Sequence, residues 1–182
     1  MKDRVCPVER AGSLDTKIRR LLQNPLKILN PFICEGMTVM DFGSGPGFFT
    51  IDMANLVGKT GRVIAADLQE GMLQKLKQKI QGTYLDECIV LHKTEVNKIG
   101  IIDILDFILL FYVVHEIPNQ DDFFKELFSI IKPDGQILLV EPPFHVNKTA
   151  FMNTIKKAEH AGFSTEEGPR ITFNRTVILR KG

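Results

Sequence analysis

Short apolar runs alternate with amphipathic segments along most of the chain. The apolar runs predict strands, because a strand buried on both faces carries hydrophobic residues at every position. These strands are expected near residues 38–42, 62–67, 88–92, 106–112 and 136–141. The segments between them repeat apolar residues at helical spacing and predict helices near residues 48–57, 70–81, 120–131 and 148–161. Strands that alternate with helices in this way indicate a parallel sheet with helices on both faces.

The end of the chain has a different pattern. Two polar–apolar segments, residues 163–166 and 171–180, are separated by a Gly-Pro pair and predict an antiparallel hairpin. Alternation in the second segment would place one set of side chains, Phe173, Arg175, Val177 and Leu179, on one face of its strand, and Asn174, Thr176 and Ile178 on the other. Such a hairpin would distinguish this sheet from that of a nucleotide dehydrogenase.

One turn signal lies within the main pattern, and a separate helical segment precedes the pattern. Lys-Pro-Asp-Gly at residues 132–135 is typical of a turn that closes a helix and opens the next strand. Before the first strand, residues 1–12 read as a loose arm, followed by an amphipathic helix from Ser13 and a short helix near residues 26–30. We therefore expect a helical extension over residues 1–35 that belongs to the same domain and either helps to cover a substrate or packs on the edge of the sheet. The main domain would span residues 36–182.

Composition limits the class of protein. The 182 residues are 44% hydrophobic and 25% charged, which fits one ordinary globular domain. The net charge of +1 argues against nucleic acid or an anionic membrane as a partner. Three dispersed cysteines, Cys6, Cys34 and Cys88, predict reduced thiols in a cytoplasmic protein. No membrane span is expected, and the sequence leaves the oligomeric state open.

A glycine-rich segment follows the first predicted strand. Gly43, Gly45 and Gly47 occupy alternate positions after Asp41 and directly precede a helical pattern. A strand that turns sharply into a helix favours glycine, because a positive φ costs other residues more. Without a Cβ atom, glycine also lets a ligand approach the backbone. The segment therefore predicts a loop that binds a nucleotide-type ligand.

The spacing of the glycines and of the next acidic residue distinguishes between two kinds of nucleotide ligand. The dinucleotide fingerprint Gly-x-Gly-x-x-Gly would need a glycine at position 48, where this chain has Phe48. A second acid, Asp67, ends the next apolar run, about 20 residues after Gly47. At that distance a βαβ unit places the carboxylate that accepts both hydroxyls of an adenosine ribose. Asp67 is therefore predicted to bind the ribose of an adenosine cofactor, the alternative being a cap for the helix near residues 70–81.

Four segments, taken in order, carry a family resemblance. They read Val-Met-Asp-Phe-Gly-Ser-Gly-Pro-Gly (39–47), Val-Ile-Ala-Ala-Asp-Leu-Gln-Glu-Gly-Met-Leu (63–73), Phe-Ile-Leu-Leu-Phe-Tyr-Val-Val-His-Glu-Ile-Pro (107–118) and Ile-Lys-Pro-Asp-Gly-Gln-Ile-Leu-Leu-Val-Glu-Pro (131–142). Together they resemble the class I S-adenosylmethionine-dependent methyltransferases, and within these the small-molecule branch that includes the ubiquinone and menaquinone biosynthesis enzymes. The resemblance implies an α/β fold, a Rossmann-like three-layer sandwich whose seven-stranded, mostly parallel sheet ends in an antiparallel hairpin. It also implies S-adenosyl-L-methionine as cofactor and a small-molecule methyl acceptor.

The same resemblance implies roles for individual residues. Asp41 would order the glycine loop or reach the cofactor ammonium through water, or alternatively cap loop amides. Leu68 would pack against adenine, and Thr94 or Glu95 is the nearest match to the acid that accepts the adenine amino group in the family. Phe111 would lie beneath the transferable methyl group. The predicted cofactor-binding residues are Asp41, Gly43, Ser44, Gly45, Gly47, Asp67, Leu68, Thr94, Glu95 and Phe111.

One histidine stands out as a candidate catalytic residue. Methyl transfer to a hydroxyl or an acidic carbon benefits from a base whose pKa lies near 7, and His115 follows the fourth predicted strand. The alternative is a histidine that caps the loop or lines the pocket passively. Glu141 and His145 would line the same mouth. No metal is expected. His115-Glu116 would begin a His-Glu-x-x-His zinc-protease motif, but the last position of that motif is Asn119 instead of histidine.

Two further functions remain open at this level. A methyltransferase-like module without catalytic activity would keep the same cofactor loop. A nicotinamide-dependent oxidoreductase of related topology is disfavoured by Phe48. The sequence thus predicts a methyltransferase whose acceptor is unidentified.

Overall fold

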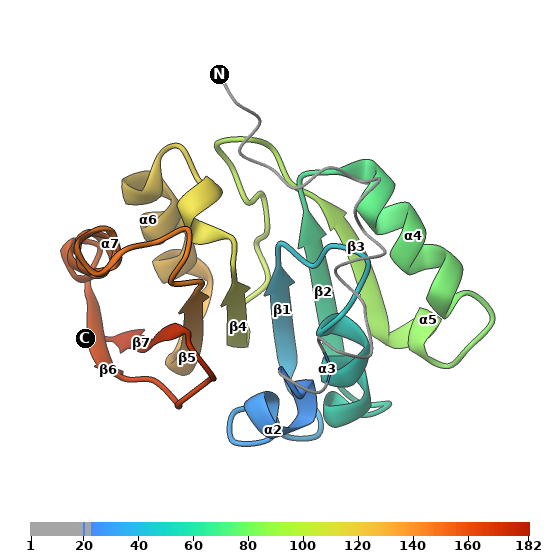
Figure 1. The fold of residues 1–182 in the computed structure, drawn as a ribbon. Coiled ribbons are helices and arrows are strands. Elements are labelled where there is room, and N and C mark those ends of the chain that lie inside the picture. The colour runs from blue at the N-terminus through green and yellow to red at the C-terminus, as the bar shows by residue number, and fades with distance from the viewer. Residues whose placement is uncertain (1–19, 21–22) are drawn as a thin grey trace. The chain divides into compact units, whose positions relative to one another are not determined.

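The computed structural model describes residue 20 and residues 23–182. The chain forms two compact units, Met1–Lys93 (unit 1) and Thr94–Gly182 (unit 2), each with its own strands and helices (Figure 1). The loose arm and the helix expected from Ser13 lie outside the described residues. The proposed division at residue 35 therefore stays a prediction.

Unit 1 contains a parallel sheet of three strands in the order β3-β2-β1. The strands are β1 (Thr38–Phe42), β2 (Arg62–Asp67) and β3 (Ile89–Lys93). The helices are α2 (Pro25–Leu29), α3 (Thr50–Val57), α4 (Glu70–Ile80) and α5 (Leu85–Cys88). The strands and long helices match their predicted positions to within about two residues, as expected for element boundaries, whereas the four-residue α5 was not predicted.

The hydrophobic pattern explains why α4 lies on this sheet. Met72, Leu73, Leu76 and Ile80 recur at helical spacing and are all buried. The helix contacts β2 and β3, while α3 contacts β1 and β2. The loop that joins β1 to α3 is held at both ends, because most residues of β1 and of α3 are buried.

Unit 2 contains the strands β4-β5-β7-β6, in that spatial order. They are β4 (Leu105–Phe111), β5 (Ile131–Glu141), β6 (Phe163–Glu167) and β7 (Arg175–Lys181). Strands β4 and β5 are parallel, whereas β7 runs antiparallel to both β5 and β6. The helices are α6 (Gln120–Ile130), α7 (Lys148–His160) and the short 3-10 helix η2 (Val114–Glu116), which was not predicted. The expected C-terminal hairpin is confirmed by the β6–β7 pair.

The turn expected at residues 132–135 is different in the structure. Strand β5 begins at Ile131 rather than near residue 136, and the segment forms an irregularity inside the β4–β5 pair. Leu105 pairs with Ile131, and both side chains are buried. Lys132 then forms an ion pair of 2.6 Å with Asp106. Because buried residues pair on both sides of the Lys-Pro-Asp-Gly motif, the motif stays within the β4–β5 pair.

The face predicted for the last strand is correct for Arg175, Val177 and Leu179, which alternate along β7, but not for Phe173. Val177 and Leu179 are buried in β7, whereas Phe173 precedes the strand and is 82% exposed. Its φ is 60°, so the extended alternation has already ended at this residue. A positive φ turns its side chain out of the pattern that the sequence indicated.

Candidate functional site

The glycine loop joins β1 to α3 and is held by hydrogen bonds to the neighbouring strand. The backbone N–H groups of Gly43 and Ser44 both donate to the carbonyl of Ala66, at 2.8 and 3.1 Å. Gly45 and Gly47 have φ of 54° and 89°, values that favour glycine. The loop therefore has the backbone conformation for which its glycines were predicted.

These two glycines have different surroundings. A Cβ atom on Gly47 would overlap Cδ1 of Leu76, which is fully buried in α4, so Gly47 is required for packing. A Cβ atom on Gly45 would meet no atom of the described residues within 4 Å. The space over Gly45 is thus where a ligand can approach the backbone of this loop.

Asp67 ends β2 and links the loop to α4. Its Oδ2 accepts the Gly45 N–H at 2.8 Å, and its Oδ1 accepts the N–H of Gln69, the N-cap residue of α4, at 2.8 Å. The side chain is 8% exposed, and burial raises the pKa of its carboxyl against the effect of these two hydrogen bonds. Each carboxylate oxygen has a second lone pair, so Asp67 retains acceptors for two hydroxyl groups.

Asp41 and Ser44 complete the described surroundings of the loop. Asp41 is 2% exposed and accepts a hydrogen bond of 2.6 Å from Oγ1 of Thr50, the first residue of α3. The Oγ atom of Ser44 is buried and has no hydrogen-bond partner in the described part of the chain. Such an orphan donor is costly unless a ligand or water satisfies it. The orphan hydroxyl and the open space over Gly45 fit the polar methionine half of S-adenosylmethionine.

The other predicted cofactor residues are distributed between the units. Leu68 follows Asp67 directly and is half-buried. Thr94 is 3% exposed, whereas Glu95 is exposed and its backbone pairs with Lys98. Phe111 ends β4 in unit 2, is 6% exposed, and its ring centroid lies 4.4 Å from that of Tyr112. Unit 1 therefore brings together Asp41, the glycines, Ser44, Asp67 and Leu68, and unit 2 holds Thr94, Glu95 and Phe111.

His115 is paired with a buried carboxylate in unit 2. Its Nδ1 lies 2.6 Å from Oε2 of Glu141, and its backbone N–H donates to Oε1 of the same residue at 2.9 Å. Glu141 is the last residue of β5 and its side chain is 2% exposed, against 25% for His115. The ring of His145 stacks on that of His115 with centroids 6.0 Å apart. Both residues that the sequence placed near His115 thus contact it.

This pairing determines how His115 can carry a proton. Burial disfavours the imidazolium, but the hydrogen bond and the charge of Glu141, with the charge of Glu116, outweigh burial and raise the pKa of His115. In the neutral ring the Nδ1–H donates to Glu141, which leaves Nε2 as the proton acceptor. Glu141 therefore holds the neutral ring of His115 in the tautomer that leaves Nε2 free of a proton.

Sequence reasoning missed the interaction that ties the end of β4 to the segment before β7. The hydroxyl of Tyr112 donates to Oδ1 of Asn174 at 2.5 Å, and Tyr112 has a φ of 62°. Its backbone N–H donates to the carbonyl of Val140. Nothing in the sequence around Asn174 indicated this contact, because the two residues are 62 positions apart.

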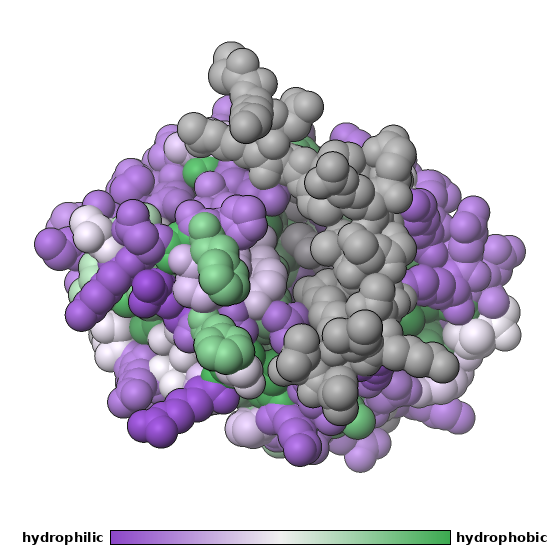
Figure 2. Space-filling model, in the orientation of Figure 1, coloured by the Kyte–Doolittle hydropathy of each residue, from purple (hydrophilic) through white to green (hydrophobic). Residues whose placement is uncertain are grey.

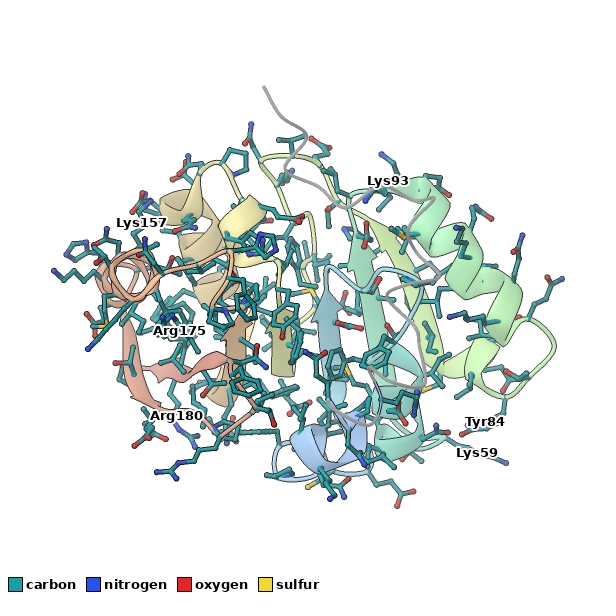
Figure 3. All side chains as sticks on the ribbon, in the orientation of Figure 1. Lys59, Tyr84, Lys93, Lys157, Arg175 and Arg180 are labelled. Carbon is teal, nitrogen blue, oxygen red and sulfur yellow. The ribbon has the colours of Figure 1, made fainter. Side chains whose placement is uncertain are left out.

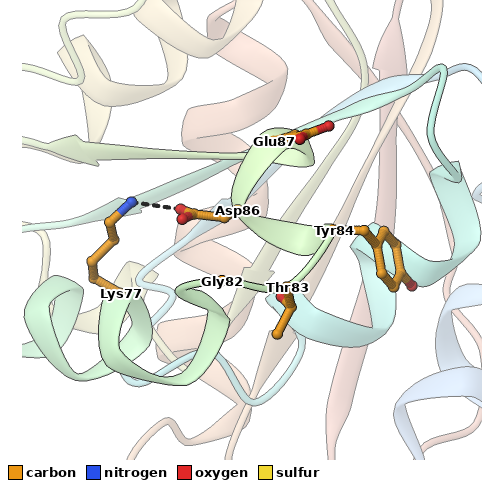
Figure 4. Close-up of a pocket in the computed structure, with 6 residues that line it drawn as sticks. All are labelled: Lys77, Gly82, Thr83, Tyr84, Asp86 and Glu87. Carbon is orange, nitrogen blue, oxygen red and sulfur yellow. Dashed lines mark hydrogen bonds and ion pairs between the residues drawn. The ribbon is translucent and has the colours of Figure 1, made fainter.

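A separate polar hollow on unit 1 lies between the end of α4 and α5 (Figure 4). Lys77 and Asp86 form an ion pair of 2.5 Å across it. Its lining residues are Lys77, Gly82, Thr83, Tyr84, Asp86 and Glu87. None of the predicted cofactor residues lines this hollow, so it is distinct from the candidate site.

Known proteins are similar to this chain in sequence or in structure. The pattern of the methyltransferase domain family matches residues 33–171. Demethylmenaquinone methyltransferases from Oceanobacillus iheyensis and Lactobacillus johnsonii are 26% and 30% identical over 106 and 107 residues, 58% of this chain and 44% of theirs. A crystal structure of a SAM-dependent methyltransferase from Aquifex aeolicus has a TM-score of 0.84 and 28% identity, over 96% of this chain and 98% of that one.

The strands and helices of the two units define an α/β protein of the Rossmann-like class. The predicted fold class is confirmed by the strand directions in the two units and by the similarity to the Aquifex aeolicus structure. The chain belongs to the methyltransferase domain family. It spans less than half the length of the curated relatives it matches.

The described residues also bear on membranes and metals. No helix within residues 23–182 is long and apolar enough to cross a bilayer. In the same part of the chain no three histidine, cysteine, aspartate or glutamate side chains are grouped as a metal site requires.

Proposed function

We propose that the protein is an S-adenosylmethionine-dependent methyltransferase that acts on a small-molecule acceptor. The observation that carries this proposal is the hydrogen bond between the Gly45 N–H and Asp67, which joins the glycine loop to the predicted ribose-binding acid. The family assignment and the similarity to the Aquifex aeolicus structure support the same activity. The relatives' names, demethylmenaquinone methyltransferases, support a small-molecule acceptor.

Within unit 1 the cofactor would be held at two places. The loop from Gly43 to Gly47, with the Ser44 hydroxyl, would bind the methionine half. Asp67 would accept the ribose hydroxyls with the lone pairs that its two backbone bonds leave available. When bound, S-adenosylmethionine supplies a methyl group already activated on a sulfonium.

Unit 2 would supply the base. Nε2 of His115 accepts the proton that the methyl acceptor loses, so that the acceptor exchanges one proton for one methyl group. Glu141 holds the ring in the tautomer with Nε2 available and stabilises the imidazolium that forms. His115 then returns this proton to solvent, to which its side chain is 25% exposed.

We also propose a cytoplasmic location. Cys34 and Cys88, the cysteines among the described residues, are free thiols. Free cysteines are typical of reducing compartments.

Calorimetric titration with S-adenosylmethionine and S-adenosylhomocysteine, with NAD as a control ligand, tests the proposed cofactor. We expect micromolar binding of both sulfur compounds, little binding of NAD, and loss of binding in Asp67→Ala. Asp86→Ala, which removes an aspartate whose ion pair lies in the separate polar hollow, is the matched control and should bind like the parent. Absence of binding by either sulfur compound would refute the proposal.

The pH dependence of turnover tests the base. Because the pKa of His115 is raised above its usual value of about 6.5, kcat should increase as the pH passes this pKa and should then level off. Glu141→Gln should move this step to lower pH, and His115→Gln should remove it while the affinity for S-adenosylhomocysteine is unchanged. Equal kcat in His115→Gln and the parent would exclude His115 from the mechanism.

A further inference from the structure

The peptide group that joins Val114 to His115 is hydrogen-bonded at both of its ends. Its N–H, which belongs to His115, donates to Oε1 of Glu141 at 2.9 Å. Its C=O, which belongs to Val114, accepts a 2.9 Å hydrogen bond from Nε2 of Gln120. Because a peptide group is planar, a bond to its carbonyl also constrains the direction of its N–H. Gln120 therefore acts on the same peptide group that presents His115 to Glu141.

The bond from Gln120 also reaches the turn that carries His115. The Val114 carbonyl accepts the N–H of Ile117 at 3.1 Å, which is the bond that closes η2. A carbonyl oxygen has two lone pairs, so the bonds from Ile117 and Gln120 use both of them. Val114 is fully buried, so these two donors hold its carbonyl in a place that water does not reach.

The start of α6 does not need the side chain of Gln120. Gln120 is the first residue of α6, and Asn119 before it is the N-cap residue. Oδ1 of Asn119 accepts the N–H of Asp122 at 3.2 Å, so the helix has its cap without Gln120. The amide group of Gln120 bonds outside its own helix instead, through its nitrogen and through its oxygen.

A buried threonine of α7 orients the Gln120 amide. Oγ1 of Thr154 donates to Oε1 of Gln120 at 3.3 Å. Most side chains at the surface around α6 and α7 are hydrophilic in Figure 2, but Thr154 is only 7% exposed. A buried hydroxyl needs a partner within the protein, and an amide whose oxygen faces this hydroxyl presents its nitrogen elsewhere. Thr154 therefore favours the orientation in which Nε2 of Gln120 faces Val114.

An ion pair joins the same two helices at the neighbouring positions. Nζ of Lys157, which is labelled in Figure 3, lies 3.4 Å from Oδ2 of Asp121. Lys157 follows Thr154 by three positions on α7, so both side chains lie on one face of that helix. Asp121 follows Gln120 directly. The two contacts thus keep Thr154 within reach of Gln120.

We propose that Gln120 and Thr154 are positioning residues for His115, which hold the Val114–His115 peptide group so that the imidazole meets Glu141 and keeps Nε2 available. This inference rests on the proposed function, because it concerns the base of that reaction. Glu141 holds the ring and the N–H of His115 from β5, and Gln120 holds the adjoining carbonyl from α6. Gln120 and Thr154 act through η2.

The charged and titratable groups around His115 make its ring a reporter of this geometry. Glu141 faces the ring from β5, Glu116 follows it in η2, and the ring of His145 stacks on it. Burial lowers the pKa of His115, but Glu141 and Glu116 outweigh burial and raise it. Gln120 and Thr154 carry no charge. A substitution of either that changes the pKa of His115 therefore acts by moving the ring relative to Glu141.

Nitrogen NMR of the imidazole rings measures the pKa and the tautomer of His115 without any ligand, and the His115 signals are those absent in His115→Gln. Gln120→Met keeps the length of the side chain but removes its amide, so it should lower the pKa of His115 and mix the two tautomers of the neutral ring. Thr154→Val should have a smaller effect in the same direction, because Gln120 remains. Thr154→Ser keeps the hydroxyl and should restore the parental values.

Thr165→Val is the matched control. Oγ1 of Thr165 in β6 donates to Oε1 of Glu159 in α7 at 3.2 Å, so this variant loses an equivalent bond in the same unit and should leave His115 unchanged. An unchanged pKa and tautomer of His115 in Gln120→Met, even with a loss of stability in urea, would overturn the inference. Equal spectra of Thr154→Val and Thr154→Ser would also overturn it.

Calorimetric titration with S-adenosylhomocysteine separates this inference from the proposed function. All of these variants should bind it like the parent, since the substitutions act on the base and not on the cofactor loop. Absent binding in the parent would refute the proposed function, whereas the NMR measurement needs no ligand and tests the positioning of His115 by itself.

Discussion

Gly45 and Gly47 have the same sign of φ and belong to the same motif, yet they serve different purposes. Gly47 lies against the buried side chain of Leu76, while the space over Gly45 is open. The sequence motif specifies glycine at both positions and does not distinguish between them. Only the surroundings of each Cα atom separate the glycine needed for packing from the glycine that we propose leaves room for a ligand.

Alanine at these two positions should therefore have different main effects. Gly47→Ala should lower the free energy of unfolding by about 2–4 kcal/mol, since backbone strain adds to a clash in the core. Gly45→Ala should cost about 1–2 kcal/mol from strain alone, and should weaken the binding of S-adenosylhomocysteine. Urea denaturation and calorimetry measure the two quantities.

Gly82 provides the control for Gly45. It also has a positive φ, 73°, and a Cβ atom added there would meet no other described residue within 4 Å, but Gly82 lines the separate polar hollow. Gly82→Ala should share the strain and keep the affinity. If Gly45→Ala binds S-adenosylhomocysteine as tightly as Gly82→Ala does, the ligand does not approach the loop at Gly45.

The His115–Glu141 pair should make stability depend on pH. The pKa of His115 is raised in the folded state, so the stabilisation by the pair is complete below about pH 6.5 and is lost as pH rises through the raised value. A hydrogen bond to a charged group contributes about 1.5–3 kcal/mol to the free energy of unfolding. Because His115 is partly exposed, we expect the contribution of this pair to lie at or below the lower end of that range.

Unfolding in urea between about pH 5.5 and 8.5 measures this effect. The difference in unfolding free energy between the parent and Glu141→Gln should shrink as pH rises. Glu87→Gln, at an exposed glutamate of unit 1, should show no such trend. A difference that grows with pH would mean that His115 is not stabilised as the cation.

At the scale of elements, one side-chain hydrogen bond joins the segments that surround the candidate base. Tyr112 follows β4 and Asn174 precedes β7, and their contact holds both segments at the end of the sheet where His115 lies. Tyr112 has a positive φ, which other contacts must maintain. The segment with His115 is thus positioned by a residue distant in sequence.

A double-mutant cycle with Tyr112→Phe and Asn174→Ala measures this coupling. We expect a coupling free energy of about 0.5–1.5 kcal/mol in urea denaturation, the contribution of one hydrogen bond between neutral groups. The exposed pair Thr165 and Glu159, 3.2 Å apart, should give a coupling near zero. Additive effects of the Tyr112 and Asn174 substitutions would show that the hydrogen bond does not hold the two segments.

At the scale of the whole molecule, ligand binding should raise thermal stability. S-adenosylhomocysteine at about 100 times its Kd adds about 2.7 kcal/mol to the free energy of unfolding. For a chain of this length, each kcal/mol shifts Tm by about 2–4 °C, so scanning calorimetry should record an increase of about 5–10 °C. Asp67→Ala should abolish the shift. A shift that survives in Asp67→Ala would contradict the role of Asp67 in ribose binding.

Much of the fold was predictable because its elements are local. The strands before Gly43 and before Leu68 are largely apolar runs bounded by polar or glycine residues, and the structure has them within a residue of the predicted limits. Errors arose where pairing overrode a local signal. The turn motif at residues 132–135 stayed within β5, because buried Ile131 pairs with Leu105.

The sequence by itself determined the family, the glycine loop and the position of Asp67, since these depend on short motifs and on spacing within one βαβ unit. The tertiary structure alone decided that Glu141 holds His115 across 26 positions and that Asn174 holds Tyr112 across 62. It also decided that Phe173 faces solvent rather than the core. Those contacts form only after strands distant in sequence have paired, because pairing, and not local pattern, brings the ends of β4, β5 and β7 together.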